Sequence, residues 1–174
     1  MRSQKGMLLN QRKYTPELIS DVGLSGAKPV NTHLEVNAKF TTVHYDAHVG
    51  GITDPILTNT TSYQKLIGRL IYLTITRPDI SFDVQVLIQF MQQPKVSHWK
   101  ATLRLVRYLK GSPDQSILQK NSPCTQLTMY CDSDWAACPN TRWPVTGYIV
   151  KVEDSFISWK SKKQHTVSRS SAEA

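Results

Sequence analysis

Apolar residues recur at helical spacing across the middle of the chain. In three successive stretches they repeat every three or four residues, the interval that places side chains on one face of a helix. These positions are Tyr63, Leu66, Ile67, Leu70 and Ile71; Ile80, Val84, Leu87, Ile88 and Met91; and Trp99, Leu103, Val106 and Leu109. Pro78 and Pro94 separate the stretches, because proline disfavours helical angles in the residue before it. The pattern predicts three helices within 62–111, the third capped by Ser97 and closed by Gly111.

The period changes to that of a strand after the third helix. Apolar and polar residues alternate over 127–132, which predicts a half-buried strand ending at Asp132, with this carboxylate on the face opposite the apolar set. Residues 146–152 predict a second strand and 156–159 a third, with a turn at 153–154 between them. Helices followed by an antiparallel hairpin beside a first strand are typical of the α+β fold class.

The N-terminal third of the chain has a weaker pattern. Residues 7–14 have the character of a strand or hairpin end, and 15–23 predict a short helix with proline in its first turn and glycine at its end. Residues 24–61 show no sustained period, which predicts a loop or linker. His44 and His48 are four residues apart, but with no helical period and no third ligand nearby they indicate loop residues rather than a metal site.

The composition is that of an ordinary globular chain with an excess of positive charge. Of 174 residues, 40% are hydrophobic and 20% charged, so a core can form. The 21 Lys and Arg residues outnumber the 13 acidic residues, giving a net charge of +8, which favours a polyanionic partner such as nucleic acid. No apolar run approaches the roughly 20 residues of a membrane-spanning helix, and no membrane partner is expected.

The cysteines and the N-terminus bear on location. The chain has three cysteines and no C-x-x-C pair, which indicates reduced thiols rather than a disulfide framework or a zinc site. A cytoplasmic or nuclear location is expected. The first 16 residues carry basic side chains and no acid, as mitochondrial presequences do, so a mitochondrial location stays open.

Two groups of basic residues are candidates for phosphate contact. The first shares one face of the third predicted helix, at positions i, i+4 and i+7. It consists of Lys100, Arg104 and Arg107. The second follows the third predicted strand and consists of Lys160, Lys162 and Lys163. Each group is open to two interpretations, a solvated surface or a contact with the sugar–phosphate backbone, which positions a nucleic acid without reading its sequence.

The C-terminal stretch carries the candidate catalytic residues. An aspartate at a strand end most often forms a turn, but it can also hold a divalent metal. Phosphodiester hydrolysis with two metals needs carboxylates from different parts of the chain around both ions. Asp132 and an acid early in a following helix would supply this. Residues 170–173 have the S-x-x-E pattern of a capping box, which predicts that a helix begins there.

Short motifs along nearly the whole chain resemble, in order, those of the copia-type retrotransposon (retrovirus-related) Pol polyproteins. They read QRKY at 11–14, KPV at 28–30, YQKLIGRL at 63–70, LTITRPDIS at 73–81, HWKA at 98–101, RYLKG at 107–111, YCDSDWA at 130–136 and SSAEA at 170–174. The resemblance implies a helical reverse transcriptase connection region followed by a partial ribonuclease H-like sheet of three antiparallel strands. In these terms 1–23 end the thumb, 24–61 form a loop or linker, 62–111 are the three-helix connection region, and 125–174 begin the ribonuclease H-like domain.

The resemblance also assigns roles to the acidic residues. Asp132 matches the first metal-binding carboxylate, which in this family binds Mg²⁺, and Asp134 belongs to the same motif in a supporting role. Glu173 matches the first glutamate of the family's Ser-Ser-x-Glu-Ala-Glu motif, whose second glutamate is the expected ligand. Glu173 is therefore a weaker catalytic candidate and is better explained as the partner of the helix cap.

Two functions follow from the resemblance. The sequence as given ends at Ala174, before the later carboxylates of the family, and the polymerase motif Tyr-x-Asp-Asp does not occur in it. The expectation is therefore a catalytically inactive remnant that still binds an RNA–DNA hybrid or another nucleic acid, with the rest of the Pol polyprotein as its context in the parent element. The alternative is a Mg²⁺-dependent ribonuclease H, active only if the missing carboxylates are supplied.

Overall fold

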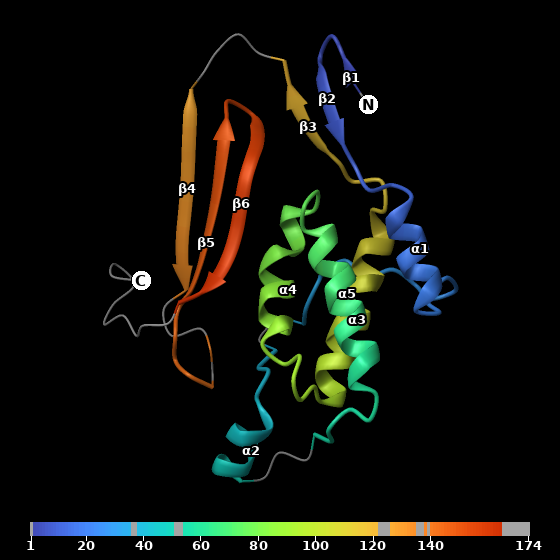
Figure 1. Cartoon of the computed structure of the whole chain (residues 1–174), viewed down its shortest axis with the longest axis vertical. Coiled ribbons are helices and arrows are strands. Elements are labelled where there is room, and N and C mark those ends of the chain that lie inside the picture. The colour runs from blue at the N-terminus through green and yellow to red at the C-terminus, as the bar shows by residue number, and fades with distance from the viewer. Residues whose placement is uncertain are drawn as a thin grey trace.

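The computed structural model describes residues 2–35, 38–50, 54–121, 126–134, 138 and 140–164. These residues form five α-helices, one short 3-10 helix and two antiparallel sheets of three strands each (Figure 1). The fold class is α+β, as the sequence predicts. No helix among the described residues is both long enough and apolar enough to cross a membrane.

The helical part holds the main core. Its elements are α1 (Tyr14–Asp21), α2 (Val43–Val49), α3 (Thr60–Leu73), the 3-10 helix η1 (Pro78–Ile80), α4 (Ser81–Ile88) and α5 (Val96–Gly111). Most of the predicted stripes of α3 and α4 is buried, and Leu70 and Leu87 have no exposed surface. The exception is Ile71, which was expected to point inward and is 41% exposed, while Ile88 and Met91 are partly buried. In α5 the buried stripe runs through Leu105 and Val106, whereas Trp99 and Leu103, expected to point inward, are half-buried.

Two predictions about the helices are wrong. The cap of α5 is Lys95 rather than Ser97, since the helix begins two residues earlier and the Lys95 backbone N–H donates to His98 Nδ1 at 3.0 Å. The predicted loop 24–61 contains α2, which Thr42 caps by accepting a hydrogen bond from the Tyr45 backbone N–H at 3.2 Å. None of the residues of α2 is fully buried, so the sequence carried no apolar stripe to reveal it.

The first sheet joins the two ends of the helical part. Its strands are β1 (Arg2–Ser3), β2 (Gly6–Leu9) and β3 (Ile117–Lys120), in the order β1-β2-β3. Of the strand or hairpin end predicted at 7–14, residues 7–9 belong to β2, and the pairing of β2 with β3 was not expected. Gly6 is required at this pairing because its φ is 141° and an added Cβ would collide with the backbone of Gln119.

The second sheet consists of β4 (Leu127–Asp134), β5 (Val145–Val152) and β6 (Ser155–Lys163), with β5 in the centre. The predicted strands and the turn at 153–154 are present, but β4 continues two residues beyond the predicted end, so Asp132 lies inside the strand opposite Gly147. β4 is also not half-buried: Leu127 and Met129 are 62% and 64% exposed. The reason is that β4 is an edge strand and its apolar set faces away from the helices.

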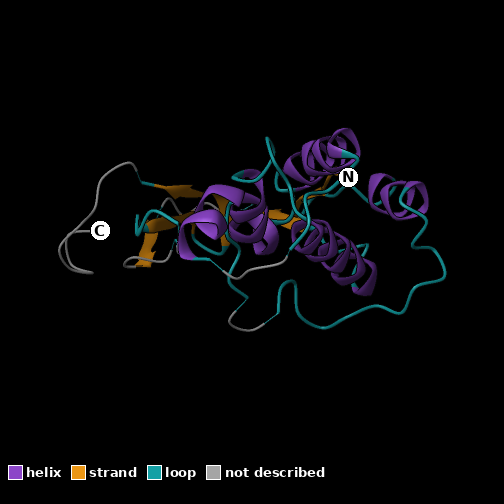
Figure 2. Cartoon of the chain, turned by 90° about the horizontal axis from the view of Figure 1, so that it is seen from below, coloured by secondary structure: helices purple, strands orange, loops and turns teal. Residues whose placement is uncertain are grey.

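The second sheet lies beside the helices, with β6 against α4 and next to β3 (Figures 1 and 2). Trp159 Nε1 donates to the Thr74 carbonyl oxygen at 2.8 Å, which joins β6 to the end of α3. The Lys120 backbone N–H donates to Ser155 Oγ at 2.8 Å, and the Gln119 side-chain amide donates to the Phe156 carbonyl oxygen. These bonds fix the sheet that carries Asp132 against the helical part.

Candidate functional site

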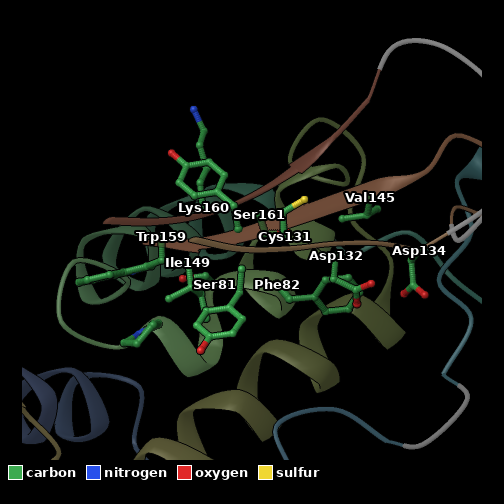
Figure 3. Close-up of a pocket in the computed structure, with 14 residues that line it drawn as sticks. Ser81, Phe82, Cys131, Asp132, Asp134, Val145, Ile149, Trp159, Lys160 and Ser161 are labelled. Atoms are coloured by element: carbon green, nitrogen blue, oxygen red, sulfur yellow. The ribbon is translucent and has the colours of Figure 1, made fainter. Parts of the chain in front are cut away.

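Asp132 lies on the wall of a cavity of about 540 Å³ between the second sheet and the start of α4. Side chains alternate along β4, so Asp132 and Asp134 point toward the helices while Cys131 points to the other side (Figure 3). The rest of the wall is mostly apolar. Its larger side chains are Phe82, Tyr130, Ile149 and Trp159. The cavity therefore combines two carboxylates with flat hydrophobic walls.

The two carboxylates are of the kind that binds magnesium. Both are exposed, and Asp132 Oδ1 accepts a hydrogen bond from the Ser133 backbone N–H at 2.9 Å. Mg²⁺ is commonly held by one or two carboxylates together with water and substrate phosphates. The described residues contain no group of three or more His, Cys, Asp or Glu side chains that could hold a metal ion. Binding of Mg²⁺ by Asp132 and Asp134 therefore stays a prediction, which would need further ligands from phosphate and water.

Glu173 and the predicted capping box at 170–173 lie outside the described residues. Their roles as second catalytic candidate and helix cap therefore remain predictions.

Lys160 is exposed on the outer face of the second sheet, the face turned away from the helices, and Lys162, two residues further along β6, is exposed on the same face. Figure 3 shows Lys160 pointing out on the same side as Cys131. Directly opposite these lysines on β5 lie Tyr148 and Thr146, so all four side chains share this face. The structure thus groups two of the three predicted lysines of β6 beside hydroxyl-bearing side chains.

Lys163 belongs to the inner face instead. Its ammonium group donates to Gln89 Oε1 and to Cys138 Sγ, each at 2.9 Å, and lies 5.4 Å from the ring centroid of Trp143. Burial alone would raise the pKa of the Cys138 thiol, but hydrogen bonds led by that of Lys163 hold it below its usual value. The structure therefore gives Lys163 internal contacts, apart from Lys160 and Lys162.

The basic face of α5 fastens the segment of residues 24–35, which we call the strap. Arg104 donates to Thr32 Oγ1 at 2.8 Å and lies 3.6 Å from Glu35 Oε1, and Arg107 Nε donates to the Lys28 carbonyl oxygen at 2.8 Å. Lys100 is exposed at the same face. Two of the three residues predicted to contact phosphate are thus already engaged in part within the chain.

Lys110 completes the attachment of the strap. Its ammonium group donates to the carbonyl oxygens of Leu24, Ser25 and Ala27, at 3.3, 2.5 and 2.7 Å. The sequence gave no sign of the three acceptors of Lys110. The signal is missing because the acceptors are backbone carbonyls, which leave no pattern in a sequence.

Two buried polar clusters were not expected from the sequence. Lys95, 2% exposed, donates to Asp46 at 2.5 Å and to Thr41 at 2.9 Å, which ties α2 and the segment before it to the start of α5. Arg77, also 2% exposed, donates from both Nε and Nη2 to the Asp79 carboxylate and from Nη1 to the Ser112 carbonyl oxygen. Both clusters join segments that are distant in the sequence.

Ionisation in these clusters follows from burial and pairing. Burial alone would raise the pKa of Asp79. The hydrogen bonds and the positive charge of Arg77 outweigh this effect, so the pKa of Asp79 lies below its usual value. Burial, helped by the positive charge of Lys95, lowers the pKa of His98 to about 4. Burial raises the pKa of Asp83 to about 6, although His33 Nδ1 lies 3.2 Å from its Oδ2. These groups support the fold and lie apart from Asp132.

Comparison with known proteins shows similarity to retrovirus-related Pol polyproteins. No protein-family model matches the chain, and no solved structure matches it. It is 40% identical to the retrovirus-related Pol polyprotein from transposon RE2 of Arabidopsis thaliana and 39% identical to that from transposon RE1 of the same plant, in each case over 99% of this chain and 11% of the relative. It is 36% identical to the uncharacterized mitochondrial protein AtMg00810 of A. thaliana, over 97% of this chain and 66% of that protein. The chain thus spans about a tenth of the length of the two polyproteins.

Proposed function

Because the chain belongs to the retrovirus-related Pol polyproteins of copia-type transposons, of which it represents a fragment, we propose that it binds nucleic acid through its second sheet. The helical part would correspond to the end of the reverse transcriptase and the second sheet to the opening of a ribonuclease H-like domain. The partner proposed is an RNA–DNA hybrid, and the remaining Pol polyprotein is the plausible context in the parent element.

The observation that carries this proposal is a group of side chains on the outer face of the second sheet, which we call the outer-face patch. It consists of Ser133, Thr146, Tyr148, Lys160 and Lys162. Ser133 Oγ and Thr146 Oγ1 lie 3.4 Å apart. Lysine, serine, threonine and tyrosine side chains are common donors to phosphate oxygens, and such contacts position a nucleic acid without reading its bases. A net charge of +8 adds attraction at longer range.

We propose further that this chain on its own binds without cleaving. Two-metal hydrolysis needs carboxylates that clamp both ions, and Asp132 and Asp134 come from a single strand. Mg²⁺, where bound, would polarise a phosphoryl oxygen as a Lewis acid. Asp132 and Asp134 are the residues that would hold it, and the outer-face patch would hold the backbone of the hybrid.

Fluorescence anisotropy with a labelled RNA–DNA hybrid tests the binding. Replacing Lys160 and Lys162 together by alanine is expected to weaken affinity by about tenfold or more, since each phosphate contact contributes on the order of 1 kcal/mol. The matched control replaces Lys13 and Lys65, two exposed lysines of the helical part, by alanine. This lowers the net charge by the same amount. If both double variants lost the same affinity, the hybrid would be attracted by net charge alone, and the outer-face patch would be rejected as its binding site.

A second function, cleavage of the RNA strand of a hybrid, is favoured by the position of Asp132 and Asp134 on the wall of an open cavity. It predicts Mg²⁺-dependent cleavage by the purified chain that disappears in Asp132→Asn. Asp114→Asn, at an exposed aspartate that pairs with Arg12 at 2.9 Å, serves as the control. Cleavage that is lost only in the first variant would replace the proposal of a non-cleaving binder.

A further inference from the structure

A groove of about 550 Å³ runs between α5 and the strap, on a part of the molecule separate from Asp132. One edge is formed by the basic residues of α5, namely Lys100, Arg104 and Arg107. The rest of the lining is mostly apolar and includes Leu24, Leu34, Phe40, Ala101 and Leu103. A groove of this size lies within the usual range of about 300–1,000 Å³ for pockets that bind small molecules.

The chain itself occupies the cationic edge in part, since Arg104 Nη2 donates to Thr32 Oγ1 at 2.8 Å. Arg104 and Glu35 are 3.6 Å apart, and the Glu35 side chain is 74% exposed. Such an exposed ion pair is worth little, about 0–1 kcal/mol, so an incoming anion can displace it. Arg107 donates to the Lys28 carbonyl oxygen through Nε, so its two Nη groups take no part in that hydrogen bond. Lys100 is exposed. The edge therefore presents three cations, and the carboxylate of Glu35 holds the place of an anion at one of them, Arg104.

We propose that this groove binds one unpaired nucleotide of a single-stranded nucleic acid, with the base on the apolar floor and the phosphate at Lys100, Arg104 and Arg107. Guanidinium groups pair with phosphate oxygens through two parallel hydrogen bonds, and an exposed lysine adds a point charge. Phe40 in the wall offers a ring against which any base can stack.

The ligand is single-stranded because a base must leave its stack to enter a groove. An acidic peptide shares the charge complementarity, but the excess of eight positive charges on the chain favours a polyanion over a short peptide. The inference rests on the proposed nucleic-acid function and adds a second site to it, for a strand that is not paired.

Three variants test the groove by fluorescence anisotropy with a short single-stranded oligouridylate. Lys100→Met removes a cation and is expected to weaken binding about fivefold, and Ala38→Trp, at an exposed position of the groove wall, is expected to block it. Glu35→Gln removes the competing carboxylate and is expected to tighten binding about threefold. Lys65→Met and Ala38→Ser are the matched controls.

The outcomes separate this site from the outer-face patch. Binding of the oligouridylate should be unchanged when Lys160 and Lys162 are replaced, and hybrid binding should be unchanged by Ala38→Trp. If replacing Lys160 and Lys162 abolished oligouridylate binding, both ligands would be assigned to the outer-face patch and the groove would be rejected. Uridine monophosphate should displace the oligomer better than ribose 5-phosphate or inorganic phosphate. Equal displacement by these, or by an acidic peptide, would overturn the nucleotide assignment.

Discussion

At the scale of single residues, the buried polar side chains explain why several sequence motifs have the composition they have. Arg77 and Asp79, in the motif that reads TRPD, form a fork-like ion pair with almost no exposed surface on the arginine. Lys95 and His98 form a second buried group at the start of α5. The sequence did not reveal that Arg77 and Lys95 are buried, because several of their partners, Ser112, Thr41 and Asp46, lie far away along the chain.

Removing Arg77 should destabilise the protein strongly. Arg77→Met leaves the partly buried Asp79 without its charged partner and with the Tyr108 hydroxyl at 3.0 Å as a neutral donor, which is expected to cost about 3–5 kcal/mol of unfolding free energy. Urea unfolding followed by far-UV circular dichroism measures this. Lys13→Met, which removes an exposed pair with Glu17 at 3.9 Å, should cost less than about 1 kcal/mol. Similar effects of the two variants would contradict the buried pairing.

His98 should make stability fall in mild acid. Its pKa is about 4 in the folded state against 6.5 for the ordinary group, so between these values the unfolded state binds the extra proton. The stability that the protein has with His98 neutral is complete above pH 6.5 and is lost progressively as the pH falls toward 4. From pH 7.5 to pH 5 the loss amounts to about 2 kcal/mol.

The comparison that isolates this effect is with His98→Asn. Asp83, whose pKa is raised to about 6, contributes with the opposite sign in the same range, but it does so equally in both proteins. The stability difference between the two proteins, measured by urea unfolding, should shrink by about 2 kcal/mol between pH 7.5 and pH 5. A constant difference would show that His98 does not titrate as described.

At the scale of elements, what the sequence could predict depended on whether the signal was local. The helices α3, α4 and α5 and the strands β5 and β6 follow from their own periodicity and their prolines and turns. The helix α2, the strand β3 and the strap have no such signal, because each is fixed by distant partners. For the candidate site, the sequence supplied Asp132 and the basic residues, but not that Lys163 turns inward or that α5 holds the strap.

The strap should loosen when its anchor is removed. Lys110→Met leaves the carbonyl oxygens of Leu24, Ser25 and Ala27 without their common donor. Hydrogen–deuterium exchange followed by mass spectrometry should then show faster exchange in peptides covering 24–35, since fewer bonds hold the segment closed. Lys100→Met should leave that exchange unchanged. Equal exchange in the wild type and Lys110→Met would reject this role of Lys110.

At the scale of the whole molecule, the structure has two parts with different chemistry. The helical part contains the main core and the groove beside α5, and the second sheet carries Asp132, Asp134 and the outer-face patch. Membership of the copia-type Pol polyproteins gives these parts a common context, and the net charge of +8 suits a nucleic-acid partner. We propose that the outer-face patch binds the backbone of a hybrid.

The salt dependence of hybrid binding tests that claim most directly. Each phosphate neutralised by a lysine contributes about 0.9 to the slope of log affinity against log salt in duplex DNA. Replacing Lys160 and Lys162 by alanine should therefore reduce the slope for the RNA–DNA hybrid by nearly two, while replacing Lys13 and Lys65 should leave it unchanged. Parallel slopes for the wild type and the Lys160 and Lys162 variant would contradict the claim.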